Sequence, residues 1–329
     1  MEIGKISNED LHRVVFDKLT ARREEVKQSS GIGVDTAVLN FGGDNIVLST
    51  DPITGASKGL GKLAVNISAN DIATEGAEPV GILITVLMPP TATIEDFEEI
   101  SKEVVEECKV LNMELIGGHS EVTDAVNRIV VSSTVIGKSK NYPKVEPEEG
   151  DVLCITKKIA VEGTHILFNE RREELKKVLD EEDVNEIKAM GDKLSVVREG
   201  LISKAYGASV LHDITEGGFY GGIWEIAKRI DMGIEIFRDA IPMYRSTEKI
   251  CKLLKLDPMR LISSGSMLIL IGEDKFEGLK SELEKENILL TKIGVVKGKE
   301  VRLKETGEII SPPDKDELYR GLVINPDID

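Results

Sequence analysis

The chain has 329 residues, of which 41% are hydrophobic, so it suits a globular protein and its length indicates two domains. It carries 42 basic and 59 acidic residues, a net charge of -17, and such a surface repels phosphate backbones, so we expect no nucleic acid partner. No apolar run is long enough to span a bilayer, and the first residues lack the apolar centre of a signal peptide. The three cysteines are far apart and lack the CxxC spacing of metal-binding sites. These features predict a cytoplasmic protein with no membrane partner.

Strands and helices alternate along the first half. Ser7 can cap an opening helix. A mostly small, apolar helix is expected at about 60–76, ahead of Pro79, and Thr93 begins an amphipathic helix. Branched and apolar runs predict strands on both sides of the turn "FGGDN", then at 80–88, 113–118 and 128–137.

The segment 138–150 is polar, contains two prolines and is typical of a connector, so we place domains at 1–140 and 150–329. The second half predicts a strand at 151–156, helices near 192–205 and 216–230, strands near 209–213 and 267–271, and a final hairpin around "ETGE". Runs of Ile and Val beside amphipathic helices indicate an α/β (α+β) fold, with a mixed sheet covered by helices in each domain.

Three aspartates stand near the ends of strands or in a buried-looking helix: Asp35, Asp51 and Asp71. A turn or a strand end would explain Asp35 and Asp51. Asp71 needs more explanation, because a buried charge must be paired, hydrogen-bonded or bound to a metal. Three carboxylates from separate segments could form a Mg²⁺ site. Spacing alone favours the structural explanation.

Two glycine-rich stretches follow predicted strands. "LIGGHSEVT" contains Gly117 and Gly118, and "VLHDITEGGFYGG" places His212 and Asp213 before a helix start. Backbone N–H groups behind glycines can bind an anion, although a tight turn explains them equally well. In "LISSGSMLI", Gly265 indicates either a close backbone approach or a bulge. Neither standard nucleotide loop is present, so phosphate binding would need another device.

Taken in order, these segments resemble the aminoimidazole ribonucleotide (AIR) synthase superfamily over about residues 30–270. "GVDTAVL" is similar to its Gly-Asp-Asp-Ala-Ala-Val segment, and "STDPITG" to its Ser-Thr-Asp segment. "VNISANDIATEGAEPVGIL" resembles its Asn-Asp helix and "IGGHSEVT" its Gly-Gly loop. "HDITEGGF" and "SSGSML" resemble its second-domain motifs. The superfamily includes HypE-type hydrogenase maturation factors, selenophosphate synthetase and thiamine-monophosphate kinase, and it implies a two-domain PurM-like fold.

The resemblance implies that the three aspartates bind Mg²⁺, that the Asn-Asp helix and the Gly-Gly loop face ATP, and that the second domain forms the substrate side. Carried over, the metal ligands would be Asp35, Asp51 and Asp71, and the residues near ATP Asn70, Lys62, Gly117, Gly118, His119 and Glu121. Ser264 and Gly265 would line the nucleotide or substrate, and His212 and Asp213 would be catalytic.

The implied chemistry is Mg-ATP-dependent phosphorylation of an amide or carbonyl oxygen, which drives dehydration or amination in hydrogenase maturation or a related pathway. The substrate would be a small-molecule or protein-borne amide. The resemblance also implies a homodimer formed through the first domains and contacts with other maturation-pathway proteins.

Some residues depart from the family pattern: Val34, His119, Ile214 and Glu216, the last of which replaces an arginine. The last cysteine is Cys251, so we expect no dehydration on the chain's own tail. Two alternatives therefore stay open: a small-molecule kinase resembling thiamine-monophosphate kinase, and a nucleotide-binding partner protein without catalysis.

Overall fold

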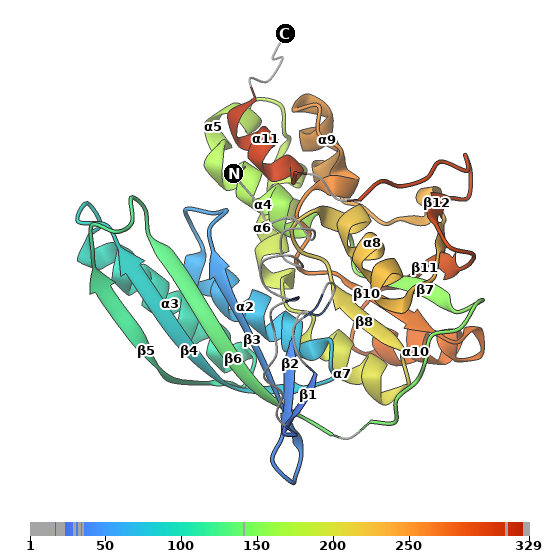
Figure 1. Cartoon of the computed structure of the whole chain (residues 1–329). Helices are drawn as coiled ribbons and strands as arrows, with labels where there is room; N and C mark the ends of the chain where they lie inside the picture. The colour runs from blue at the N-terminus through green and yellow to red at the C-terminus, as the bar shows by residue number, and fades with distance from the viewer. Residues whose placement is uncertain are drawn as a thin grey trace.

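The computed structural model describes residues 17, 24–28, 31, 34, 36–140, 142–312 and 315–324, which form two six-stranded sheets with helices packed on them (Figure 1). The predicted helix after Ser7 and the candidate ligand Asp35 lie outside the described residues. The predicted α/β class with two mixed sheets is confirmed. The predicted division at 140–150 falls between the last strand of the first sheet and the first strand of the second, and it remains a prediction.

The first sheet has the strand order β1-β2-β3-β6-β4-β5, in which only β4 and β5 pair in parallel. Its strands are β1 (Val26–Gln28), β2 (Ala37–Asn40), β3 (Asn45–Ile53), β4 (Glu78–Met88), β5 (Glu114–Val122) and β6 (Val130–Ser139). Helices α2 (Leu60–Ala73) and α3 (Ile94–Val110) cover one face, and no described helix covers the other face, called the open face below (Figure 1).

The local sequence explains both helices. In α2, small apolar side chains allow the helix to lie between the sheet and the second half, and twelve of its fourteen residues are buried. The helix ends at Ala73, three residues before the predicted end, and Gly76 turns the chain with a φ of 61°. Thr93 caps α3 as predicted, in a reciprocal capping box with Asp96.

The second sheet has the order β12-β9-β11-β7-β10-β8, and all neighbours are antiparallel except β12 and β9. Its strands are β7 (Val152–Thr156), β8 (Val210–Asp213), β9 (Ile234–Ile236), β10 (Met267–Ile271), β11 (Leu290–Val296) and β12 (Val301–Leu303). Helices α7 (Val197–Ala205) and α10 (Glu273–Lys285) pack on one face and α8 (Gly218–Ile230) on the other. Because both faces are covered, every residue of β7 and β10 is buried.

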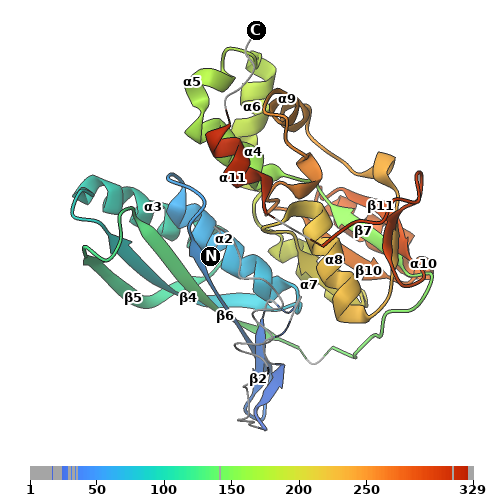
Figure 2. The same cartoon turned by 45° about the horizontal axis from the view of Figure 1, so that its top comes forward.

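Five further helices gather at one end of the second half, at the top of Figure 1: α4 (Val161–Glu170), α5 (Arg172–Leu175), α6 (Glu181–Met190), α9 (Arg245–Leu253) and α11 (Glu317–Val323). Helix α11 lies against α4 in both views (Figures 1 and 2). Short 3-10 helices occupy Gly191–Lys193, Arg238–Ala240 and Pro258–Arg260. The predicted helix at 192–205 is therefore two elements, with α7 beginning only at Val197.

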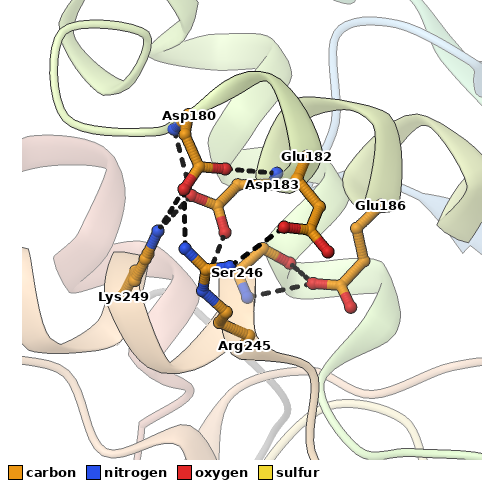
Figure 3. A network of polar contacts seen from close by, with 7 residues as sticks. All are labelled: Asp180, Glu182, Asp183, Glu186, Arg245, Ser246 and Lys249. Atoms are coloured by element: carbon orange, nitrogen blue, oxygen red, sulfur yellow. Dashed lines mark hydrogen bonds and ion pairs between the residues drawn. The ribbon is translucent and has the colours of Figure 1, made fainter.

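A polar network joins α6 to α9 (Figure 3). Asp180 and Asp183 form a capping box at the start of α6. Lys249 bonds both carboxylates, and Arg245 bonds Asp180 at 2.6 Å. Within the described part of the chain, no helix is both long and apolar enough to cross a bilayer.

Candidate functional site

A cavity of about 530 Å³ lies between the two halves of the molecule. Its first-half wall comes from β2, β3, the loop after β3, and α2, and its second-half wall from the start of α4, the loop between β8 and α8, the segment before β10, and α11. The polar side chains on it are Thr36, Ser49, Thr50, Asp51, Thr54, Asp71, Thr134, Glu162, Thr215, Glu216, Ser264, Asp316 and Tyr319.

Two of the three predicted metal ligands meet on the first-half wall. Ser49 Oγ donates a short hydrogen bond to Asp71 Oδ2 and also lies 3.5 Å from Asp51 Oδ2, so one hydroxyl connects both carboxylates. Helix α2 crosses β3 at this point, which brings Asp71 beside a strand distant in sequence. Asp71 is only 5% exposed, and its burial is explained by its contact with the cavity and with Ser49.

This arrangement suits Mg²⁺, since carboxylate and hydroxyl oxygens are the hard donors that the ion prefers. The described residues include no group of three or more His, Cys, Asp or Glu side chains arranged to hold a metal. A cation beside Asp51 and Asp71 would therefore take further ligands from phosphate oxygens and water, which is the usual way in which Mg²⁺ is bound with nucleotides.

Glu162 faces these aspartates from the second-half wall and was not among the residues predicted from the sequence. It stands in the first turn of α4 and is 3% exposed, and its Oε2 accepts a hydrogen bond of 3.3 Å from Ser264 N. Burial raises the pKa of Glu162 to about 7, with smaller contributions from Asp316 and Glu216. A carboxyl group that titrates near neutral pH in a cavity is suited to proton transfer.

Asp316 was also not among the residues predicted from the sequence, and it connects several segments of the same wall. It caps α11 by accepting from Leu318 N at 2.8 Å, and it also accepts from Gly217 N at 2.7 Å and Ile262 N at 3.1 Å. One carboxylate thus holds three separate segments around the cavity. Burial raises its pKa to about 6, although these three N–H groups oppose the change. Burial and the nearby acidic groups raise the pKa of Tyr319 to about 12.

Asn70 does not line the cavity. Its Oδ1 accepts from Val196 N at 2.7 Å, and its Nδ2 donates to Leu194 O at 2.8 Å, so a fully buried amide connects α2 to the second half. Lys62, on the same helix, also lies outside the cavity lining. Its Nζ pairs with Asp192 at 2.7 Å and with Glu107 at 3.2 Å.

The predicted second-domain residues are divided between the cavity and the core. Ser264 lines the cavity, whereas Gly265 lies outside its lining, with a φ of 107° and an added Cβ only 2.8 Å from Lys193 O. His212 and Asp213 are 2% and 1% exposed at the end of β8 and do not line the cavity. His212 Nε2 lies 3.0 Å from Glu225 Oε2 of α8.

The Gly-Gly stretch lies on β5, at the edge of the first sheet, and not on this cavity. There Gly117, Gly118 and His119 line a separate hollow of about 440 Å³ between β5 and α3. An added Cβ at Gly118 would lie 1.9 Å from Ile84 O, so glycine is required for the close pairing of β4 and β5. His119 Nε2 lies 3.3 Å from Glu121 Oε2, and both side chains are exposed.

Comparisons with known proteins agree with this architecture. Residues 33–139 match the family model for the N-terminal domain of AIR synthase related proteins, and residues 148–304 match the model for the C-terminal domain. A hydrogenase expression/formation protein of Methanocaldococcus jannaschii is 28% identical over 286 residues, which are 83% of this chain and 82% of that protein. The HypE carbamoyl dehydratase of Escherichia coli is 25% identical over 267 residues, covering 78% of this chain and 77% of that protein.

Among solved structures, the hydrogenase maturation protein HypE in complex with ATP superposes with a TM-score of 0.72. The match has 20% sequence identity and covers 86% of this chain and 89% of the other. At this identity the likeness shows a common fold. With the two sheets and the two family models in the same order, the chain belongs to the AIR synthase related family.

Proposed function

We propose that this chain is an Mg-ATP-dependent phosphoryl-transfer enzyme whose reaction takes place in the cavity between its halves. The observation that carries the proposal is the pair Asp51 and Asp71, connected by Ser49 and faced by the buried Glu162 across one cavity. Family membership and relatives named as hydrogenase formation and carbamoyl dehydratase proteins support it.

In this mechanism Asp51 and Asp71 would hold Mg²⁺, which neutralises phosphate charge when bound. An amide oxygen of the acceptor attacks the γ-phosphorus, the bond to the β–γ bridging oxygen breaks, and ADP leaves. Glu162 takes the N–H proton that the phosphorylated amide must lose. The attached phosphate is then a good leaving group. In a dehydration the C–O bond breaks and the phosphate leaves with the second N–H proton, whereas in an amination an incoming amine displaces the phosphate.

The proposal includes the cellular setting that the family suggests: a cytoplasmic protein that acts with other factors of hydrogenase maturation or a related pathway. It also includes a homodimer formed through the open face of the first sheet. Two large apolar side chains of β4, Val80 and Leu83, are 47% and 39% exposed and do not line the hollow between β5 and α3. A second copy of the chain covering this face would remove them from water.

The test measures Mg-ATP binding and turnover on the full chain. We expect Mg-ATP, but not ATP with a chelator, to raise the melting temperature, because a ligand that binds only the folded state stabilises it. Asp51→Asn should remove most of this shift, whereas the exposed Asp124→Asn should not change it. A folded wild-type protein with no shift at millimolar Mg-ATP would disprove the nucleotide assignment.

Product analysis separates the remaining alternatives. A dehydratase releases ADP, phosphate and an acceptor that has lost water, whereas a small-molecule kinase releases ADP and a phosphorylated acceptor. Binding of Mg-ATP without turnover on any amide or phosphate-accepting substrate would instead identify a non-catalytic nucleotide-binding protein.

A further inference from the structure

A second cavity between the halves has a volume of about 610 Å³ and lies against the connector at 138–150, so it is called the connector cavity below. Its walls come from β1, β2, β3 and the turn after α2, from the connector, and from the end of α7, the start of β8 and the end of α8. It shares no described lining residue with the cavity that contains Asp51 and Asp71. It is therefore a separate candidate site.

The charge of the connector cavity is opposite to that of the chain as a whole. Five positive side chains and two carboxyl groups line it, a surplus of three positive charges, whereas the chain carries a net charge of -17. The positive groups are Lys27, Lys140, Lys144, Lys204 and Arg229, and the carboxyl groups are Glu75 and Glu146. Lys144 and Glu146 pair with each other at 2.5 Å, so the surplus comes from the cations around Glu75. A hollow lined by one sign of charge attracts ions of the other sign.

Glu75 satisfies these cations only in part. Its Oε1 accepts from Gln28 Nε2 at 3.2 Å and lies 3.5 Å from Arg229, and its Oε2 lies 3.5 Å from Lys204 Nζ. The Lys204 side chain is only 20% exposed, yet its ammonium makes no hydrogen bond to a described residue. Within the described part of the chain, the side chain of Lys140 makes neither a hydrogen bond nor an ion pair. An ammonium group has three donors, so N–H groups remain for an anion.

The position of Lys204 is fixed by packing. Gly76, in the turn after α2, has a φ of 61°, and a Cβ added there would lie 2.5 Å from Lys204 Cβ and 3.3 Å from Tyr142 Cε2. Glycine thus lets the stem of Lys204 and the ring of Tyr142 approach the same turn. Ser139 Oγ donates to Glu75 O at 2.9 Å and attaches the start of the connector to that turn. Lys204 therefore belongs to a built wall, unlike a surface lysine that moves freely.

The donors of this wall suit a phosphate group. A guanidinium and ammonium groups are the side chains that bind phosphate oxygens through charge-assisted hydrogen bonds. A phosphate monoester carries a charge of about -2 near neutral pH, which the surplus of three can neutralise, whereas the several charges of metal-free ATP would exceed it. The rest of the lining includes Val47, Tyr142, Pro147 and Ile230, which offer apolar contacts to an organic group beside the phosphate.

We propose that the connector cavity binds a phosphate dianion through Lys204, Arg229 and Lys140. The shared chemistry is the phosphate, and the apolar lining favours a small organic phosphate over the free ion as its source. The inference does not rest on the proposed function, because the two cavities have no lining residue in common.

The experiment titrates the full chain with phenyl phosphate, inorganic phosphate and phenol by calorimetry, at matched ionic strength and about pH 8, where phosphate monoesters are dianions. A chelator removes Mg²⁺, so the other cavity, whose described lining contains no Lys, Arg or His, has no cation to attract a phosphate. We expect phenyl phosphate to bind at least tenfold more tightly than phenol. Tighter binding of phenyl phosphate than of inorganic phosphate supports an organic phosphate as the source, and equal binding supports free phosphate.

Lys204→Met keeps the stem beside Gly76 and removes the charge, so it should weaken phenyl phosphate binding at least tenfold. Lys292→Met is the matched control, because Lys292 is also partly buried and pairs with a glutamate at 2.8 Å, on β11 and outside both cavities. It should change binding less than twofold. Lys140→Met is a second variant that should weaken binding without affecting folding, because Lys140 is exposed. Melting curves of each variant confirm folding before titration.

Three results would overturn the proposal. The first is a folded wild-type protein that binds no phenyl phosphate at millimolar concentration, or binds phenol equally tightly. The second is an equal loss of binding in Lys292→Met and Lys204→Met, because the effect would then be that of net charge alone. The third is a tenfold change of phenyl phosphate binding in Asp51→Asn, which would place the phosphate in the other cavity.

Discussion

Asn70 of the first half and Val196 of the second are joined by a 2.7 Å hydrogen bond between Asn70 Oδ1 and Val196 N. The same amide donates to Leu194 O at 2.8 Å, and its side chain is fully buried. The polar pair Asn70-Asp71 in a buried helix thus has two separate explanations. Asn70 connects the two halves, whereas the neighbouring Asp71 faces the cavity between them.

Asn70→Ala should destabilise the protein by about 2 to 3 kcal/mol, because it removes the side-chain partners of a buried N–H and a buried carbonyl group. Urea denaturation measures this change. Asn185→Ala is the control, since Asn185 is exposed in α6 and its replacement should alter stability by less than about 0.5 kcal/mol. Equal stability of the Asn70→Ala variant and wild type would show that the connection contributes nothing.

Asp71→Asn separates the metal role from a structural one. If Asp71 binds Mg²⁺, the neutral variant should weaken Mg-ATP binding at least tenfold, about 1.4 kcal/mol. The apo protein should stay as stable as wild type or become slightly more stable, because a carboxylate near Asp51 is removed while the acceptor for Ser49 is kept. Calorimetric titration and apo melting curves decide between the roles. A variant that melts early and binds Mg-ATP normally would contradict the metal assignment.

Local signals predicted the elements well where periodicity and caps agree. Thr93 was predicted to start α3, where it forms a capping box with Asp96, and the branched, apolar run at 80–88 lies within β4. The sequence did not predict α4, α5, α6, α9 or α11, although Asp180 and Asp183 form a capping box visible in the sequence. Short helices stabilised by packing against one another carry weak patterns of their own, so their existence depends on tertiary contacts.

The site was predictable mainly on the first-half wall, since Ser264 is the one predicted site residue that lines the cavity from the second half. The motif resemblance pointed to Asp51 and Asp71, which meet because α2 packs on β3. The only local signal for Glu162 is that it is a single acidic residue within the apolar run "IAVEGTHILF". Because the helix dipole alone explains a glutamate in the first turn of a helix, this signal does not indicate a functional site. Asp316 had no local signal beyond that of an ordinary helix cap, since its bonds to Gly217 and Ile262 span 99 and 54 positions of the sequence, respectively.

The network between α6 and α9 should contribute to stability mainly through its buried member (Figure 3). Asp183, whose side chain is 1% exposed, accepts from Lys249 and from the Asp180 N–H. Asp183→Ala should lower the free energy of unfolding by about 2 kcal/mol, since it removes the reciprocal cap and leaves Lys249 and Arg245 without their buried partner. Glu182→Ala on the same helix removes an ion pair whose carboxylate is 85% exposed, so it should cost less than about 0.5 kcal/mol. Equal losses in thermal melts would contradict this ranking.

The open face of the first sheet should mediate a homodimer. Light scattering at micromolar concentration is expected to give twice the chain mass for wild type. Leu83→Lys places a charge among the exposed apolar residues of β4 and should produce monomers. Val323→Lys is the control, because Val323 is 80% exposed at the end of α11, in the other half of the chain. A monomeric wild-type protein would disprove the dimer.

Glu162 should make the apo protein less stable as the pH rises toward neutrality. Burial raises the pKa of its carboxyl group from 4.5 to about 7, so between these values the folded state holds a proton that the unfolded state has lost. The free energy of unfolding therefore falls as the pH rises through this window, by on the order of 3 kcal/mol in total for this group. The pKa of Asp316 is raised from 3.8 to about 6, so its ionisation also lowers the free energy of unfolding as the pH rises.

Glu162→Gln removes the titration and keeps an acceptor for Ser264 N, so only the contribution of Glu162 should disappear. Urea denaturation without Mg²⁺ or nucleotide, from pH 4 to pH 8, should show the variant more stable than wild type at pH 8. The two curves should converge near pH 4, where the carboxyl group is protonated in both states. The variant should still show the decrease in the free energy of unfolding that Asp316 causes between about pH 4 and pH 6. A variant less stable than wild type at pH 8 would mean that ionised Glu162 has a stabilising partner in the fold, which would also remove it as the group that accepts a proton during the reaction.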